Sequence, residues 1–549
     1  MFTNATLPPS EAQSVPEQSG SDRLVTGLLF ALSLAYLLAF RRYATMEPDE
    51  GILLQGAQRI LHGQVLYRDF FSFFTPGSYY FLALIFGIFG NSFLVARTVL
   101  AVIGGVCSVV SYLLARRTCS PGTALITAAL VTLTTLPYRF LVLHNWDSTL
   151  WACLAIYCAV RFIERPHWKW AFSLGSFASV TTLFEQSKGA GLCLGLGLGI
   201  GILVLAGGRR DLLQRTLVVG ILTGLSWPWL LTFVYFAARH SVPVMLADWF
   251  WPLQHYSLAN RVPYGYQNWS DSTRHLLFGS GSLGMRVLKA LIVSPCFFLP
   301  VFPIIALGLL VYWSARIRGE ARNPKAGYYV ITTAVLSGLL LSIVTVRADI
   351  IHFMYLQPLF CLVLAWIMEG RDLPGQWLRS LRPALAVYMT VALLAFAVPL
   401  GLRAAAASHK IETRRGTIYT SAKDSALELT LAHVPANESV LVYPYLPLYY
   451  YLTDTSNPTR YDYFQPGMNT PAQAQEIISQ IQSGKVRVVL FESSFPEKIP
   501  NSWPKTPLRA IADDPVADSI VRSYRSCEIL NSVEGWRFLF MVRKQAACP

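Results

Sequence analysis

The stretch MEPDEGILLQGAQRILHGQVLYRDFFSFFTPGSYY, Met46–Tyr80, decides how the rest of the chain is organised. It follows the first apolar segment directly and is much longer than a connection between two neighbouring helices needs to be. After the acidic pair Asp49–Glu50, apolar residues recur at helical spacing, which predicts a helix lying along a membrane interface. The positive end of the helix dipole favours ionised carboxylates at its start. A charged loop that only caps a membrane helix is the alternative.

The composition of the 549 residues is that of a polytopic membrane protein. The mean hydropathy is +0.42, and hydrophobic residues make up 53% of the chain while charged residues make up only 14%. Soluble domains carry about 25% charged residues, so this balance excludes a soluble globular chain. The net charge of +14 does not indicate nucleic-acid binding, because the basic residues punctuate apolar segments instead of forming one stripe.

Apolar segments predict about 11 transmembrane helices, given that a bilayer core needs roughly 20 residues per crossing. The segment Tyr79–Phe89 is too short for this and is assigned to an interfacial helix. With that assignment the basic loops fall on one side of the membrane, as the positive-inside rule requires. The predicted spans are Leu24–Phe40, Phe93–Ala115, Ala124–Leu136, Leu150–Phe162, Trp170–Phe184, Ala190–Ala206, Leu217–Ala237, Val287–Trp313, Tyr328–Val346, Ile351–Met368 and Ala384–Leu402.

This arrangement places the N-terminus in the cytoplasm and the C-terminus outside it. Residues 1–22 are expected to be a disordered cytoplasmic segment, residues 23–404 the membrane domain, and residues 41–91 and 239–285 external loops. After residue 405 short apolar strands alternate with helices, which predicts an extracytoplasmic α/β domain over 405–549. Its predicted elements are strands at Ser439–Tyr445, Val486–Phe491 and Trp536–Val542, and helices at Thr470–Ile481 and Val516–Tyr524.

Two further features have a structural interpretation. The run Gly189–Gly201 has the spacing of a nucleotide-binding loop, but no strand–turn–helix context surrounds it, so we interpret its glycines as sites of close helix contact. Most cysteines lie in apolar segments and behave as small hydrophobes. Cys527 and Cys548 lie in the external domain and can pair in an oxidising compartment. No Cys or His spacing indicates a metal site.

Polar side chains that do not anchor the topology gather on the external face, which predicts a polar cavity at the outer membrane boundary. Such a cavity suits transfer from a lipid-linked phosphate donor. That chemistry needs a carboxylate base for the acceptor, cations for the leaving phosphate and an apolar groove for the lipid tail. We assign Asp49, with Glu50 beside it, as the catalytic candidate. The candidates for binding donor phosphate or substrate are Arg68, Asp69, His144, Asp147, Lys188, Arg347, Asp349 and His352.

The first loop resembles that of the GT-C superfamily of integral membrane glycosyltransferases, in the branch of protein O-mannosyltransferases and lipid A aminoarabinose transferases. The resemblance implies that the acidic residue of this loop, here Asp49, acts as the base or orients the acceptor. It also implies a polyprenyl-phosphate sugar donor, an acceptor that is a lipid, glycan or protein, and inversion at the anomeric carbon. The matching residues are Asp49–Glu50, Leu66-Tyr67-Arg68-Asp69-Phe70, Pro76-Gly77, Tyr79-Tyr80, Phe89-Gly90-Asn91-Ser92 and Ala96-Arg97.

The chain departs from the aminoarabinose-transferase pattern at Thr75-Pro76-Gly77, where a Lys-Pro is usual. The lysine for the lipid phosphate is therefore missing at this point, and Lys188 or Arg68 is expected to substitute for it. Some relatives use a divalent metal and others do not, so the requirement for a metal cofactor is left open. The expected enzyme is a hexosyl- or pentosyltransferase of the plasma (inner) membrane, which works within the lipid bilayer and without nucleic acid.

Two other functions are alternatives to the glycosyltransferase. A transporter or flippase for a lipid or sugar would carry charges near mid-membrane and broken helices in two matching halves. The sequence has no clear internal repeat, and its charges lie at the ends of the predicted helices. A non-catalytic scaffold for envelope assembly would leave Asp49 free to vary. The glycosyltransferase is the favoured hypothesis.

Overall fold

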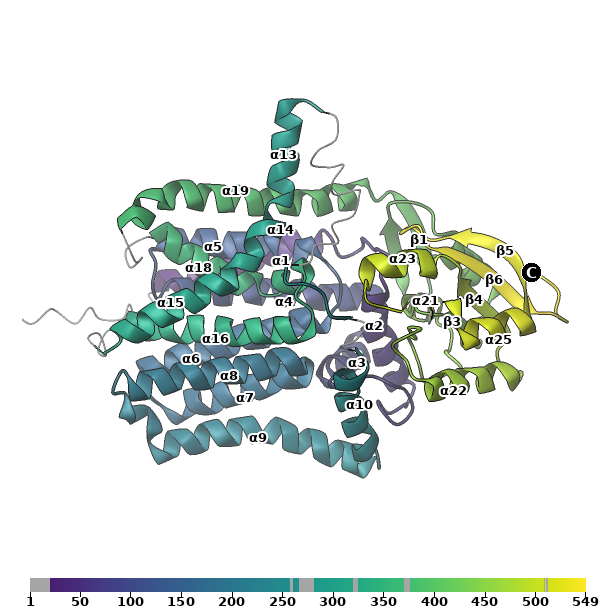
Figure 1. The fold of residues 1–549 in the computed structure, drawn as a ribbon, viewed down its shortest axis with the longest axis horizontal. Helices are drawn as coiled ribbons and strands as arrows, with labels where there is room; N and C mark the ends of the chain where they lie inside the picture. The colour runs from purple at the N-terminus through teal and green to yellow at the C-terminus, as the bar shows by residue number, and fades with distance from the viewer. Residues whose placement is uncertain are drawn as a thin grey trace, which may run out of the picture.

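The computed structural model describes residues 20–256, 260–265, 281–318, 324–369, 376–507, 509 and 512–549. The predicted disordered N-terminus lies outside the described residues except for its last three positions, and so does most of the stretch 257–280 of the predicted external loop 239–285. The described chain consists of a helical bundle, a layer built from the first loop, and a C-terminal region that contains the strands (Figure 1).

Most helices of the bundle lie side by side along the longest axis of the molecule, whereas the helix at Leu283–Val293 stands out from it (Figure 1). Several begin where the sequence supplies a cap: Ser92 and Ser120 each accept a hydrogen bond from the backbone amide three residues on. Each predicted span falls on one or more of these helices. They are α1 (Gly20–Leu38), α4 (Phe93–Ala115), α5 (Pro121–Thr134), α6 (His144–Glu164), α7 (Trp168–Phe184), α8 (Gln186–Leu205), α9 (Arg215–Ala238), α13 (Leu283–Val293), α14 (Pro295–Phe298), α15 (Phe302–Arg316), α16 (Pro324–Val346), α17 (Ile350–Met354), α18 (Gln357–Glu369) and α19 (Gln376–Ala406).

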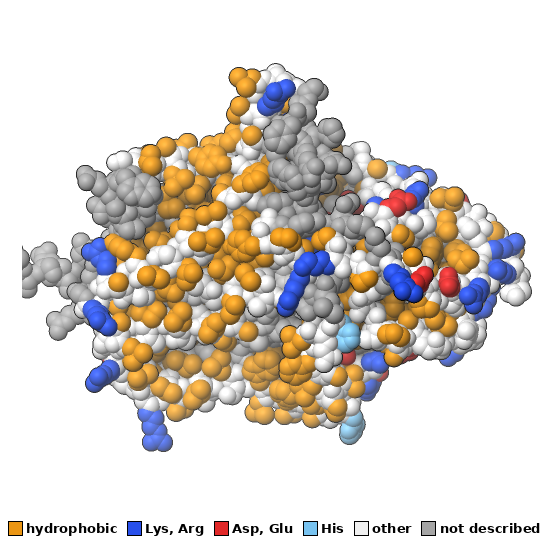
Figure 2. All heavy atoms as spheres, in the orientation of Figure 1, with side chains coloured by type: hydrophobic (Ala, Val, Ile, Leu, Met, Phe, Trp, Pro, Cys, Tyr) orange, Lys and Arg blue, Asp and Glu red, His pale blue; other side chains and the backbone are white. Residues whose placement is uncertain are grey.

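The surface of the bundle is that of a membrane protein, as predicted. Among the described residues, six helical segments are long and apolar enough to cross a membrane by themselves. Figure 2 shows hydrophobic side chains spread over the bundle, with Lys and Arg at the end farthest from the C-terminal region. A separate apolar core fills the space between the helices. The polytopic helical fold class is therefore confirmed.

The glycine run of α8 packs directly against α16. A Cβ atom added to Gly338 would lie 2.1 Å from the Gly191 carbonyl oxygen, and one added to Gly195 would lie 2.5 Å from the Val335 Cα. Only glycine permits backbones to approach this closely. The interpretation of this run as a helix contact is confirmed.

The first loop folds into two helices, α2 (Pro48–Leu61) and α3 (Gly77–Phe89). Helix α2 is amphipathic, as its spacing predicts, but it is buried along most of its length because a second layer covers the side away from the bundle. Helix α3 has 13 residues, which is too short for a crossing of about 20 residues. Both helices therefore stay at one end of the bundle.

The C-terminal region forms a four-stranded sheet in the order β3-β4-β6-β5, in which only β3 and β4 are parallel, and a separate β1–β2 hairpin. The predicted strands correspond to β3, β4 and β6. The sequence did not predict β5, because most of its side chains are polar and exposed. Cys527 and Cys548 form a disulfide. The elements are β1 (His409–Thr413), β2 (Gly416–Thr420), α20 (Ser425–His433), β3 (Val440–Tyr443), α21 (Leu448–Thr453), α22 (Pro471–Gln482), β4 (Val488–Glu492), α23 (Phe495–Ser502), α25 (Pro515–Ser523), β5 (Tyr524–Asn531) and β6 (Arg537–Arg543).

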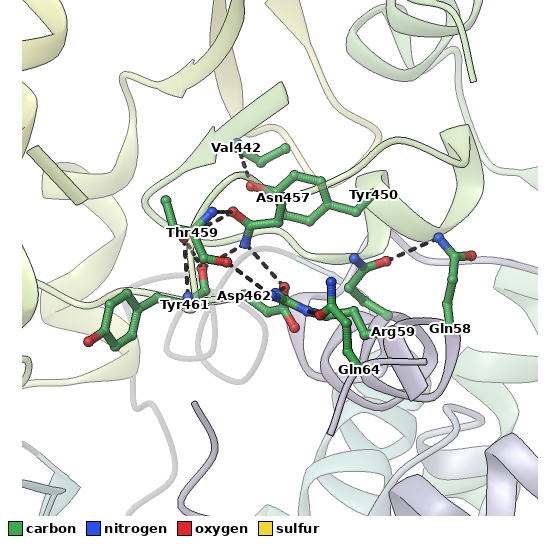
Figure 3. Close-up of polar contacts among 10 residues, drawn as sticks. Gln58, Arg59, Gln64, Val442, Tyr450, Asn457, Thr459, Tyr461 and Asp462 are labelled. Carbon is green, nitrogen blue, oxygen red and sulfur yellow. Dashed lines mark hydrogen bonds and ion pairs between the residues drawn. The ribbon is translucent and has the colours of Figure 1, made fainter. Parts of the chain in front are cut away.

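The C-terminal region is fastened to the first loop by a buried polar junction (Figure 3). The Arg59 guanidinium of α2 forms an ion pair with Asp462 at 2.7 Å, and both side chains are only 7% exposed. The same guanidinium donates a hydrogen bond to the Thr459 carbonyl oxygen at 3.1 Å. Nearby, Gly51 leaves no room for a Cβ beside the backbone of Leu448. One apolar core runs through both segments, so the first loop is held between the bundle and the C-terminal region.

Candidate functional site

A cavity of about 810 Å³ lies where the bundle, the first loop and the C-terminal region meet. Its wall on the bundle side carries both polar and apolar side chains, and Ile343 and Val346 of α16 are among the apolar ones. Of the predicted site residues, it is lined by Asp49, His144, Lys188, Arg347, Asp349 and His352. The structure therefore brings together residues that are separated by up to 303 positions in the sequence.

Asp49 presents a half-exposed carboxylate to this cavity. It begins α2 beside Glu47, and both carboxylates bind the guanidinium of Arg139, at 2.8 Å from Asp49 Oδ2 and 2.5 Å from Glu47 Oε2. The Asp49 side chain is 44% exposed, and its Oδ1 has no hydrogen-bond partner among the described residues. Arg139 also donates a hydrogen bond to the Tyr355 hydroxyl. One oxygen of Asp49 is therefore held in place and the other is open to a ligand.

Glu50 points the opposite way. Its side chain is fully buried, forms an ion pair with Arg97 of α4 at 2.7 Å, and accepts a hydrogen bond from the Val142 amide at 3.0 Å. Successive residues of a helix lie about 100° apart, so adjacent carboxylates need not share a face. Glu50 does not line the cavity, and its contacts are those of a residue that joins the first loop to the bundle.

Lys188 lines the cavity, but its ammonium group is already surrounded. It binds the carboxylate of Glu185 at 2.9 Å and donates hydrogen bonds to the Asn145 carbonyl, Ser148 Oγ and Thr149 Oγ1 at 2.8–3.1 Å. Its side chain is only 4% exposed. Three N–H donors facing four acceptors leave little capacity for a phosphate. These contacts tie the start of α8 to that of α6.

Arg347, Asp349 and His352 form one connected group at the end of α16. Asp349 accepts hydrogen bonds from Arg347 Nε at 2.5 Å and, through its other oxygen, contacts His352 Nδ1 at 2.7 Å. Burial raises the pKa of Asp349, but the neighbouring His352 and Arg347 outweigh it and hold that pKa well below its usual range. The Arg347 guanidinium lies 5.2 Å from the centre of the Trp503 ring. Arg347 is thus a fixed cation on the cavity wall.

The three remaining predicted residues, Arg68, Asp69 and Asp147, do not line the cavity. Arg68 and Asp69 pair with each other at 2.7 Å on the surface of the first loop. Asp147 lies one helical turn behind His144 on α6 and accepts a hydrogen bond from Ser78 Oγ at 2.6 Å. His144 itself lies on the cavity wall, with its ring centre 4.3 Å from that of Phe74.

Comparisons with known proteins find matches to part of the sequence and to the fold. Residues 74–233 match the family model of dolichyl-phosphate-mannose-protein mannosyltransferases. The apo crystal structure of ArnT from Cupriavidus metallidurans superposes with a TM-score of 0.51 at 14% identity, over 97% of this chain and 100% of that one. The apo Archaeoglobus fulgidus oligosaccharyltransferase also gives 0.51, at 11% identity, over 97% and 76% of the two chains. The chain has the GT-C fold. No curated protein sequence matches it.

Several residues that line the cavity were not predicted from the sequence. Arg139 could have been found, because an arginine on the external side violates the positive-inside rule and needs a partner. Glu47 is its second carboxylate partner. No local pattern marks the cavity residues of the C-terminal region, because they meet the membrane residues only through tertiary folding. These are Tyr445, Phe495, Lys498, Ile499, Trp503, Glu534 and Trp536.

The residues that line the cavity do not form a recognisable metal site in the part of the chain that the structure describes. No three His, Cys, Asp or Glu side chains there are grouped so as to hold an ion. The two adjacent carboxylates, Glu47 and Asp49, both bind Arg139. A divalent cation would have to displace that guanidinium.

Proposed function

We propose that the chain is a membrane glycosyltransferase that moves a sugar from a polyprenyl-phosphate donor to an acceptor in this cavity. The GT-C fold supports the enzyme class, and the matched family model, which is named for dolichyl-phosphate-mannose, supports the kind of donor. The observation that carries the proposal is the position of Asp49. Its carboxylate has one oxygen fixed by Arg139 and the other open to a cavity that is lined by both apolar side chains and cations.

In the proposed reaction, Asp49 Oδ1 takes the proton from the acceptor hydroxyl or amine as that group attacks the anomeric carbon of the donor sugar. The bond from this carbon to the phosphate oxygen breaks, and its electron pair leaves with the lipid phosphate. Attack from the side opposite the leaving group inverts the anomeric carbon. Arg139 holds the carboxylate in place through the ion pair and orients it.

The leaving phosphate gains negative charge and needs a cation in a fixed position. Arg347 fits this role, because it lies on the cavity wall next to Val346, and the apolar side chains of Val346 and Ile343 offer a surface along which a lipid tail can lie. Lys188 is a weaker candidate because Glu185 and three oxygen acceptors already surround it. Arg68 lies outside the cavity. The proposal therefore assigns Arg347, and neither Lys188 nor Arg68, to the role of the missing lysine.

The multi-pass chain is proposed to lie in the plasma (inner) membrane with the cavity and the C-terminal region outside the cytoplasm. The Cys527–Cys548 disulfide supports this orientation, because such bonds persist in oxidising compartments. The basic end of the bundle, opposite the C-terminal region, supports it as well (Figure 2). The transferred sugar is proposed to be a hexose or pentose, and the acceptor a lipid, glycan or protein.

The proposal is tested by transfer of radiolabelled sugar from a polyprenyl-phosphate donor to membrane extracts by the reconstituted protein. Asp49→Asn is expected to lower the rate by about 10²–10⁴, the usual contribution of a general base. Asp69→Asn is the matched control, because that carboxylate lies outside the cavity, and it should keep nearly the full rate. Equal rates for wild type and Asp49→Asn would refute the role of this carboxylate.

A further inference from the structure

Four lysine and arginine side chains line the described part of the cavity, and three of them have a carboxylate partner. Arg139 binds Glu47 and Asp49, Lys188 binds Glu185, and Arg347 binds Asp349. Lys498 of α23 is the fourth. Among the described residues, no carboxylate oxygen lies within 4 Å of its ammonium nitrogen. In the described part of the chain, Lys498 is therefore the one cavity-lining cation without a direct carboxylate partner.

The surroundings of Lys498 hold its ammonium group at the cavity wall. The nitrogen lies 3.9 Å from the centre of the Trp536 ring and donates a hydrogen bond to the Glu534 carbonyl oxygen at 3.0 Å. Burial lowers the pKa of Lys498, and the charges of Glu492, Glu534 and Glu497 only partly offset this. A cation that is partly shielded from water and has no carboxylate partner is stabilised when an anion binds to it.

The three acidic neighbours do not take the place of that anion. Burial raises the pKa of Glu492 to about 8, so this side chain is mostly protonated at neutral pH. Glu497 pairs with Arg537. The side chain of Glu534 is exposed and forms no ion pair with Lys498.

The position of Lys498 indicates which ligand would reach it. Helix α23 lies in the C-terminal region, beyond the end of the bundle (Figure 1). In the proposed reaction the lipid tail of the donor lies against the bundle and its phosphate lies beside Arg347. Lys498 and Trp536 line the cavity from the C-terminal region, the side from which a water-soluble acceptor group would enter.

We propose that Lys498 is a specificity-determining residue that binds an anionic group, phosphate or carboxylate, on the acceptor. This inference rests on the proposed glycosyltransferase function and adds the chemistry of the acceptor. Trp536 and the Glu534 carbonyl fix two sides of the ammonium group, and the ligand anion completes its coordination. An uncharged acceptor would leave the partly buried cation without a counter-ion and would bind less tightly.

The test measures binding of glucose 6-phosphate and of glucose to the full-length protein in nanodiscs by isothermal titration calorimetry. Glucose 6-phosphate is expected to bind wild type about tenfold more tightly than glucose, as one charge-assisted hydrogen bond predicts. Lys498→Met should abolish this difference, and Lys498→Arg should retain most of it. Lys485→Met, at an exposed lysine of the same region that does not line the cavity, should leave it unchanged.

A second arm titrates undecaprenyl phosphate into the same variants and separates the acceptor from the donor. Its affinity should be the same for wild type and Lys498→Met. If Lys498→Met instead weakens undecaprenyl phosphate and spares glucose 6-phosphate, the lysine serves the donor and the proposal is wrong. The proposal also fails if wild type does not prefer glucose 6-phosphate or if Lys498→Met keeps the preference. The sugar-transfer assay with Asp49→Asn tests the proposed glycosyltransferase function separately, whatever these binding measurements show.

Discussion

Asp49 and Glu50 are neighbours in the sequence and have opposite environments in the fold. The Asp49 carboxylate is 44% exposed and faces the cavity, whereas that of Glu50 is fully buried against Arg97. Breaking a buried ion pair typically costs about 3–5 kcal/mol, so Glu50 is needed to keep the first loop on the bundle. A loss of activity in a Glu50 variant would therefore not identify it as a catalytic residue.

A second buried carboxylate gives a prediction for stability. Burial raises the pKa of Glu492 in β4 to about 8, against an ordinary value of 4.5. The contribution of the Glu492 carboxyl to stability is fully present below about pH 4.5, where it is protonated in both the folded and the unfolded state. This contribution is lost as the pH rises through about 8. Glu492→Gln keeps an acceptor for the Ser494 hydroxyl and cannot ionise.

The unfolding midpoint of Glu492→Gln should therefore match that of wild type near pH 5 and exceed it by about 5 °C at pH 9. Intrinsic fluorescence during heating in detergent at the two pH values measures this difference. Midpoints that differ from wild type by the same amount at both pH values would show that Glu492 does not ionise in this range.

The sequence could predict individual site residues only where local chemistry marks them. The pattern Asp49–Glu50 at a helix start is visible in the sequence, and so is the group of Arg347, Asp349 and His352. The sequence does not show which of these two carboxylates faces the cavity, because that depends on which face of α2 meets Arg97. The same limit applies to Lys188, whose ammonium group is surrounded by three acceptors of α6 and by Glu185, the residue before its own helix.

Among the secondary-structure elements, the contact between α8 and α16 depends on glycine. Gly338→Ala would place a Cβ 2.1 Å from the Gly191 carbonyl oxygen, so the two helices would have to separate. Overpacking of this kind costs about 1–3 kcal/mol. The unfolding midpoint is expected to fall by several degrees.

Gly197→Ala is the matched control, because a Cβ at that position, on the partner helix α8, meets open space. It should keep or slightly raise the midpoint, since alanine favours a helix over glycine by about 1 kcal/mol. Equal midpoints for both variants would mean that the close approach is not needed.

Strand prediction depended on how deeply each strand is buried. All four residues of β3 are buried, and its apolar run was visible in the sequence. Strand β5 has an exposed, largely polar surface, so its pairing with β6 has no counterpart in its own residue pattern. Each predicted span falls on one or more helices for the same reason as β3, because long apolar runs mark them.

At the scale of the whole molecule, the first loop and the C-terminal region share one core and meet at the Arg59–Asp462 ion pair (Figure 3). The sequence indicated two separate units, because the contacts between them join residues about 400 positions apart. The cavity exists only where these units meet the bundle. The junction therefore links the external region to the catalytic candidate.

The orientation of the whole chain in the membrane can be measured with reporter fusions. Helix α16 runs from Pro324 at one end of the bundle to Val346, which lines the cavity at the other. A reporter at Lys325 should therefore be cytoplasmic, and one at Ser439 should be external. Reporters found on the same side would contradict the proposed topology.

The most direct test of the central claim, that this cavity binds the lipid-linked donor beside Asp49, is a cryo-EM map of the protein with a polyprenyl phosphate. We expect the phosphate density within hydrogen-bond distance of Arg347, with the lipid tail along Ile343 and Val346 and with room for a sugar between the phosphate and Asp49. Phosphate density at Arg68, or anywhere outside the cavity, would contradict the account.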